Sequence, residues 1–181
     1  PEFRELDPVA LKEVVAIPMF RLSRCVLAPH GHPIARGKLT LERIAKYPII
    51  AYSRPPNWKW LFGDAFVDAG LKPRVVLNAL DPEVSTTYVR LGMGIAVLAT
   101  MVHDSVHAGD LVALDADHLF EPGVLMLVLR KGAYVSRHVY SLLSIFAPHL
   151  DSVLIQKYVD GAPVDREQLA RIAPFAKGFG T

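Results

Sequence analysis

The chain has 181 residues, enough for one ordinary domain or for one small domain and part of another. Hydrophobic residues make up 51% of the chain and the mean hydropathy is positive, which predicts a packed core and excludes extensive disorder. The formal charge is +2, from 20 basic and 18 acidic residues, and this near balance does not fit the basic surface that nucleic-acid binding needs. If the protein acts on DNA, we expect another segment to touch it.

The single cysteine, Cys25, excludes an internal disulfide framework and fits a reducing compartment. It stands in an apolar run with no histidine or helix start beside it, so we interpret it as a buried apolar residue and not as a reactive thiol. No apolar run approaches the roughly 20 residues of a membrane span, and we expect no signal peptide before Pro1. The absence of an initiator Met indicates a fragment or a processed chain. A cytoplasmic, soluble protein is the expectation.

Strand-like and helix-like segments alternate along the first half of the chain. In chain order we expect strands at 14–20 and 25–28, a turn at 29–33, a helix at 41–46 capped by Thr40, a strand at 48–52, a loop at 53–57, an amphipathic helix at 58–69 that ends at Gly70, and a strand at 74–79. Strand, helix and strand joined by short loops predict right-handed parallel crossovers in one sheet.

The segment 79–99 is the predicted centre of the fold. Asp81 is placed to cap a short helix, and Gly92 is placed to end it, because a residue without Cβ enters the left-handed conformation cheaply. We expect the apolar stripe of this helix, Val84, Tyr88 and Leu91, to face the core. The strand at 95–99 is apolar without alternation, which is typical of a strand that is covered on both faces and has parallel neighbours.

The second half of the chain adds two strands and further helices. We expect strands at 111–114 and 124–129, a long helix at 134–147 with the stripe Val135, Val139, Leu142, Leu143 and Phe146, and short helices at 153–159 and 166–172. There is no internal repeat and no low-complexity stretch.

Two pairs of histidines are candidate metal ligands. His103 and His107 have the i, i+4 spacing of a zinc helix, but Asp104 stands where the catalytic motif has Glu, and no third ligand follows. His30 and His32 flank a glycine in a turn. We interpret all four as structural or surface residues and predict no metal site.

Known catalytic motifs are missing from the sequence. The Gly92-Met93-Gly94 run follows a helix and lacks the third glycine, so it does not match a dinucleotide fingerprint. There is no Gly-x-Ser-x-Gly elbow, phosphate loop or paired-carboxylate motif. We therefore predict no catalytic residue and no cofactor, although dispersed residues can catalyse reactions without any motif.

The loop after the strand at 48–52 is the predicted ligand site. Ligands of open parallel sheets bind beyond the carboxyl ends of strands, at helix N-termini. Ser53, Arg54, Asn57 and Trp58 lie where such a strand end meets the predicted helix, and their N–H, hydroxyl and amide groups suit a small anion or carboxylate. The alternative is that Asn57 only caps the helix and the prolines only stiffen the loop. The negative charge of Asp81 disfavours an anion at the start of the helix that this residue is predicted to cap.

Several segments, which follow one another in the same order as in the family, resemble LysR-type transcriptional regulators of the CysB-like branch. These regulators are the activators of sulfur assimilation and cysteine biosynthesis. The segments are Ala45–Tyr52, Ala65–Phe66, Ala69–Arg74 and Thr87–Gly94, with further matches at Pro29, His32–Pro33 and Phe146–Leu150. The resemblance covers about residues 14–150. It implies an α/β fold in which a Rossmann-like parallel or mixed sheet forms one subdomain of a type II periplasmic-binding-protein-like effector domain, with two such subdomains around a cleft.

The resemblance also implies a division of the chain. Residues 1–13 would be the tail of effector subdomain I, 14–121 subdomain II, 122–150 the return strand and helix of subdomain I, and 151–181 the C-terminal helices or tail. The winged helix-turn-helix of the family has no counterpart here, so DNA is expected to be bound only through a domain absent from this chain. The strand at 124–129 and the helix at 134–147 would then lack their usual packing partner, which predicts self-association.

The function implied by the resemblance is co-inducer sensing by a regulator that is not an enzyme. The family holds its anion with hydroxyl and amide side chains, and Asn57 is the matching position here, where the branch typically carries Thr. The implied effectors are O-acetylserine or N-acetylserine, with sulfate or thiosulfate as counter-signals, and the implied assembly is a homodimer or homotetramer in which the helix at 58–69 contributes contacts. The alternative is a solute-binding protein or an enzyme domain on the same two-lobed fold, which the coding sequence upstream would distinguish.

Overall fold

The structure is a computed structural model in which residues 12–54, 59–99 and 109–162 are described. Of these, 12–21 and 124–162 form one compact unit (unit 1), and 22–123 form a second (unit 2). Within the described residues the chain therefore passes between the units twice, after Arg21 and after Gly123.

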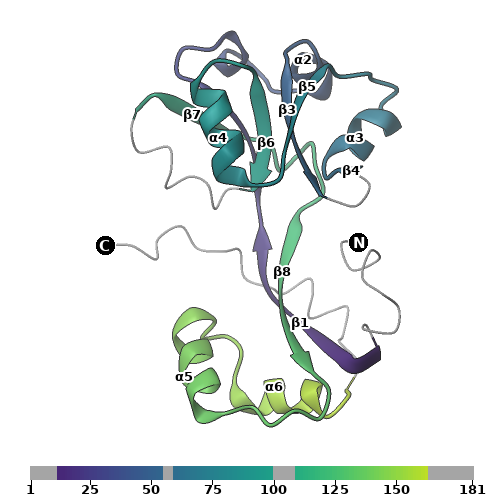
Figure 1. Ribbon diagram of the computed structural model, residues 1–181, viewed down its shortest axis with the longest axis vertical. Coiled ribbons are helices and arrows are strands. Elements are labelled where there is room, and N and C mark those ends of the chain that lie inside the picture. Colours follow the sequence, from purple (N-terminus) through teal and green to yellow (C-terminus); the bar gives the residue numbers. More distant parts are fainter. Residues whose placement is uncertain (1–11, 55–58, 100–108, 163–181) are drawn as a thin grey trace. The chain divides into compact units, whose positions relative to one another are not determined.

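The elements alternate as the sequence predicts, although several bounds differ. In chain order they are β1 (Val14–Leu22), β2 (Arg24–Pro29), the 3-10 helix η2 (Pro33–Ala35), α2 (Leu41–Ala45), β3 (Ile49–Arg54), β4 (Lys59–Trp60), α3 (Gly63–Asp68), β5 (Val75–Ala79), α4 (Pro82–Arg90), β6 (Ile95–Ala99), β7 (Leu111–Asp115), β8 (Gly123–Arg130), α5 (Arg137–Phe146) and α6 (Ser152–Val159) (Figure 1). The predicted helix at 166–172 lies outside the described residues.

Unit 2 is built on a mixed sheet with the strand order β4-β3-β6-β2-β7, and β5 also pairs with β3. The predicted parallel pairing holds for β3 with β5 and for β3 with β6. By contrast, β2 is antiparallel to both β6 and β7. The chain enters β2 directly from β1, so no helical crossover forces this strand to be parallel. The prediction of an α/β fold with a parallel or mixed sheet is confirmed.

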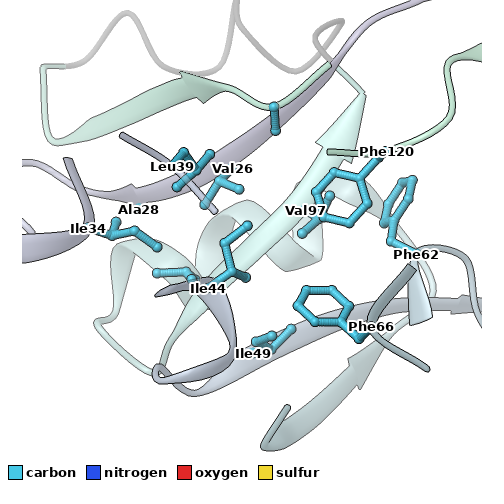
Figure 2. Packing of buried hydrophobic residues seen from close by; sticks show 12 residues of the cluster. Val26, Ala28, Ile34, Leu39, Ile44, Ile49, Phe62, Phe66, Val97 and Phe120 are labelled. Carbon is cyan, nitrogen blue, oxygen red and sulfur yellow. The ribbon is translucent and has the colours of Figure 1, made fainter. Parts of the chain in front are cut away.

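Both faces of the unit 2 sheet are covered, as the apolar sequence of β6 predicts. On one face, Ile44 of α2 and Phe66 of α3 pack with Ile49 of β3 and with Phe62 and Phe120 (Figure 2). On the other face α4 contacts β2, β3 and β6, and Val89 of α4 packs there against residues of all three strands. Successive residues alternate between the two clusters, so the side chains of residues 25–28 in β2 and 95–98 in β6 are all buried. Cys25 of β2 is buried on the face of the sheet that α4 covers, as predicted.

The ends of α4 confirm the predictions from local chemistry. Asp81 Oδ1 accepts the backbone N–H of Glu83 at 2.6 Å and that of Val84 at 3.4 Å. Gly92, just past the helix, has φ +74°, a left-handed conformation that costs glycine little.

The predicted apolar stripe of α4 is wrong at Val84 and Leu91, whereas Tyr88 packs against the core as predicted. Val84 and Leu91 are 44% and 68% exposed, whereas Ser85, Thr86 and Val89 are buried. The two hydroxyls donate to carbonyls one turn back within the helix, Ser85 to Asp81 at 3.1 Å and Thr86 to Pro82 at 2.8 Å. Because these hydroxyls are satisfied locally, small polar side chains can lie against the sheet without a desolvation penalty.

The predicted helix at 58–69 is wrong in its first part. Lys59 and Trp60 form β4, which pairs antiparallel with Arg54 and Ser53 of β3, and the helix α3 begins only at Gly63. The Trp60 ring stacks on Phe66, with ring centroids 5.0 Å apart. The aromatic residues with helical spacing are therefore buried by two elements, a short strand and a short helix, and not by one continuous helix.

Unit 1 contains the two-stranded sheet of β1 and β8 with α5 and α6. Its core joins alternate residues of β1, such as Val15 and Ile17, to Leu143 of α5 and Ile155 of α6. The helix predicted at 134–147 begins at Arg137, and Leu142 of its predicted stripe is exposed. The helix predicted at 153–159 is confirmed as α6.

None of the described helices is long and apolar enough to cross a membrane.

Candidate functional site

The carboxyl ends of the parallel strands β3, β5 and β6 meet at one edge of the unit 2 sheet. Ser53, near the end of β3, is fully buried, and its Oγ donates a hydrogen bond to Oδ1 of Asn78 in β5 at 2.9 Å. On the other side of the site, Ser53 pairs across the short antiparallel ladder with Trp60 of β4. Polar groups from three strands therefore gather at this edge.

The four residues predicted to bind an effector fall in this region. Ser53 has a described side chain, and Arg54 is the last residue of β3, where its backbone pairs with Lys59. Asn57 and Trp58 lie outside the described residues. The Ser53 side chain contacts Asn78.

The structure corrects the reason for which Asn57 was chosen. Because α3 begins at Gly63, Asn57 does not cap that helix, and the residue at the cap position, Phe62, makes no side-chain capping bond. The other helix start at this edge belongs to α4, where the Asp81 carboxylate already accepts two backbone N–H groups. A site at this edge therefore depends on side chains and not on a helix dipole.

Sequence reasoning missed Asn78 and Trp60. Asn78 interrupts an otherwise apolar strand, Val75–Ala79, and this polar interruption was the available signal. Trp60 Nε1 is buried and has no hydrogen-bond partner among the described residues. Buried indole N–H groups normally find an acceptor, so this donor is unusual.

The turn histidines have structural roles. His32 Nδ1 accepts the backbone N–H of Ile34 at 3.2 Å, and its ring packs edge-on against Tyr47 at 4.6 Å. Partial burial lowers the pKa of His32 below its ordinary value of 6.5, because the charged form is less well solvated. No group of three His, Cys, Asp or Glu side chains in the described parts of the chain could hold a metal ion. His103 and His107 lie outside those parts.

A separate, shallow hollow of about 680 Å³ lies in unit 1. It is lined by Tyr140 of α5 and by residues of α6 and its C-terminal end, Ser152, Val153, Gln156, Lys157, Asp160 and Ala162. Tyr140 donates to Gln156 at 3.0 Å, and Gln156 in turn donates to Asp160 at 2.9 Å. Three of the polar side chains in the hollow are therefore paired with one another, unlike the indole N–H at the β3 edge.

The family model for the LysR substrate binding domain matches residues 3–151 of the chain. The chain belongs to this family. The HTH-type transcriptional regulator SsuR of Burkholderia cenocepacia is 44% identical over 144 residues, which are 79% of this chain and 47% of SsuR. The HTH-type transcriptional regulator CysB of Haemophilus influenzae is 34% identical over 151 residues, which are 83% of this chain and 46% of CysB.

A solved structure supports the same family assignment. The crystal structure of the cofactor-binding domain of the Cbl transcriptional regulator superposes with a TM-score of 0.72 at 34% identity, covering 86% of this chain and 67% of that one. The LysR substrate-binding chain spans about half the length of SsuR and CysB. The resemblance to LysR-type regulators of the CysB-like branch is thus confirmed, and so is the effector-domain fold that it implies.

Proposed function

We propose that this chain is the effector-sensing part of a LysR-type transcription regulator of sulfur assimilation. The observation that carries the proposal is the 44% identity to SsuR over 79% of the chain, to which the identities with CysB and Cbl add weight. All of these relatives are named as transcriptional regulators and none as an enzyme, so we assign no catalytic activity. In this proposal DNA is bound through another domain, the regulator is a cytoplasmic homodimer or homotetramer, and units 2 and 1 correspond to effector subdomain II and to part of subdomain I.

We place the effector at the carboxyl edge of β3, with Ser53, Arg54, Asn57 and Trp58 as its binding residues. Ser53 is fully buried and bonded to Asn78, so its contribution is to orient the Asn78 carboxamide at the edge of the sheet. Arg54 carries the positive charge of the segment, and Asn57 carries an amide that can donate to an anion. This set of donors suits a small anion of the acetylserine or sulfate type.

Such an effector changes transcription only if it binds two arrangements of the regulator with different affinity. Its binding then shifts the population towards the arrangement that it prefers, and the shift is limited by the difference between the two affinities. The proposal therefore requires measurable binding by the isolated chain.

Calorimetric titration with O-acetylserine, N-acetylserine, sulfate and thiosulfate tests the site. We expect heat with at least one of these ligands and about a tenfold loss of affinity in Asn57→Ala, as one lost charge-assisted hydrogen bond implies. Thr87→Ala is the matched control, because Thr87 is exposed on α4 and bonds only to the Glu83 carbonyl. No heat with any ligand, or equal binding by Asn57→Ala, would overturn the site assignment.

The coding sequence upstream of residue 1 tests the wider function. A regulator requires a helix-turn-helix there, whereas a secreted solute-binding protein on the same fold requires a signal sequence. Finding the signal sequence would contradict the proposal.

A further inference from the structure

One arginine of unit 2 lies beside both points at which the chain crosses between the units. Arg24, three residues after the first crossing, is only 7% exposed. Its backbone N–H donates to Asp117 Oδ1 at 2.5 Å, and its carbonyl accepts the N–H of Ala116 at 3.0 Å. The first residue of β2 is thereby fixed to the segment that leads towards the second crossing.

The side chain of Arg24 reaches the second crossing itself. Its Nε donates to the carbonyl of Glu121 at 3.2 Å, and its guanidinium carbon lies 5.0 Å from the centroid of the Phe62 ring. A Cβ at Gly123 would collide with Nη2 of Arg24. A side chain at this position would therefore displace the guanidinium from its contacts.

The strands beyond these two crossings do not join the sheet of unit 2. In the described residues β1 and β8 pair only with each other, as a two-stranded sheet. Two-stranded ribbons twist more strongly than larger sheets and are marginal by themselves. The connection between the units thus passes from segments held by Arg24 to a two-stranded ribbon that packs against α5 and α6.

We infer that Arg24 is a positioning residue that fixes both described crossings of the chain to unit 2, so that the two segments leave unit 2 as a pair. A buried guanidinium is costly to desolvate, and an apolar side chain of similar length would fill the same space at less cost. Gly123 leaves room for the guanidinium, which donates to the Glu121 carbonyl and lies over the Phe62 ring. An apolar residue would make neither of these directional contacts. This inference does not depend on the identity of the effector.

Hydrogen–deuterium exchange of the 181-residue chain, in a double-mutant cycle, tests the inference. In Gly123→Ala we expect exchange to become about tenfold faster at residues 116–124 and at the adjoining ends of β1 and β8, while β3 and β6 keep their rates. In an Arg24→Met background, Gly123→Ala should add less than about a twofold change, because the group with which the new methyl collides is gone. Arg24→Lys replaces Arg24→Met if the latter does not fold.

The matched control is Arg130→Met at the other end of β8. The Arg130 side chain is exposed and lies 3.7 Å from Glu13, and we expect no change in exchange at residues 116–124. Equal acceleration in β3 and β6 would show that Arg24 only stabilises unit 2 as a whole. Full, independent effects of the two substitutions would show that Gly123 does not act through Arg24. Either result would overturn the inference.

Discussion

The two sheets of this chain differ in how completely they are covered. The central strands of unit 2 are buried on both faces, between α4 on one side and α2 and α3 on the other. In unit 1, β8 alternates between residues that face the core, such as Leu127, and residues that do not, such as Val128, which is exposed. Large apolar side chains of α5 and α6, among them Ile145 and Val153, are exposed as well. The central strands of unit 2 are therefore covered on both faces, whereas β8 of unit 1 is covered on one, although unit 2 also exposes large apolar side chains such as Val67 and Leu91.

This difference fits the lengths of the relatives. The chain spans about half of SsuR and of CysB, and the Cbl cofactor-binding domain is also longer than the part that this chain matches. The expectation that β8 and α5 pack against a further part of the effector domain stays a prediction. It has measurable consequences, because a two-stranded sheet with exposed apolar residues is marginal without a partner.

The largest expected effect comes from breaking the closed core of unit 2. Phe66 is fully buried, stacks on Trp60 and lies 5.9 Å from the Phe120 ring, so Phe66→Ala should cost about 3–5 kcal/mol of unfolding free energy. Its neighbour Val67 is 72% exposed, and Val67→Ala should stay within about 0.5 kcal/mol. Urea denaturation measures both. If Phe66→Ala costs no more than Val67→Ala, unit 2 is not the closed core described here.

The next largest effect is a difference in unfolding free energy between alanine substitutions at Gly94 and at Gly92. A Cβ on Gly94 would lie 2.5 Å from the carbonyl oxygen of Pro48, so Gly94→Ala should cost about 2–3 kcal/mol through overpacking at the start of β6. Gly92 has open space around its Cα but φ +74°, so Gly92→Ala should cost only about 1 kcal/mol of conformational strain. Equilibrium unfolding of the two variants gives the order. The reverse order would contradict the close approach of Gly94 to Pro48.

We expect self-association of the chain to depend on exposed residues of unit 1 and not on those of unit 2. Ile145 of α5 and Val67 of α3 are equally exposed, both 72%, and so form a matched pair. We expect Ile145→Lys to raise the concentration at which the chain associates by about tenfold, since a buried isoleucine contact is worth at least that much, and Val67→Lys to change it less. Sedimentation velocity over a concentration series measures this. A chain that is monomeric throughout, with little binding of a hydrophobic dye, would contradict the account of unit 1.

The smallest effect is a pH dependence within unit 2. Burial lowers the pKa of His32, so its neutral form is favoured in the folded chain, where Nδ1 accepts the Ile34 N–H. Its contribution to stability is complete above the unfolded pKa of about 6.5 and is lost as the pH falls from there towards the folded pKa. His32→Asn keeps an acceptor at the cap and should remove this part of the pH dependence. Urea midpoints between pH 5 and 8 test it, and an identical slope in the variant would contradict the assignment.

The sequence was a good guide where local chemistry decides the structure. The Asp81 cap, the end of α4 at Gly92 and the burial of β6 all follow from residues within one turn or one strand. It failed where side-chain hydrogen bonding and strand pairing override the apolar pattern. The stripe of α4 was misassigned because Ser85 and Thr86 satisfy their hydroxyls within the helix, and the start of α3 was misplaced because β4 pairs with the edge of β3.

The candidate site shows the same division. The rule that ligands bind beyond the carboxyl ends of parallel strands selected the end of β3, and Ser53 lies there. Asn78 was not selected, because its hydrogen bond with Ser53 joins residues 25 positions apart. The burial of the Trp60 indole depends on its stacking with Phe66, which no local pattern reveals.

Amide chemical-shift mapping during titration with O-acetylserine and with sulfate tests the central claim most directly. The account predicts that the shifts cluster at residues 53–60 and 78–81, around the carboxyl edge of β3, and that they saturate. Saturating shifts at Tyr140 and Gln156 in the hollow of unit 1, with none at the β3 edge, would contradict it.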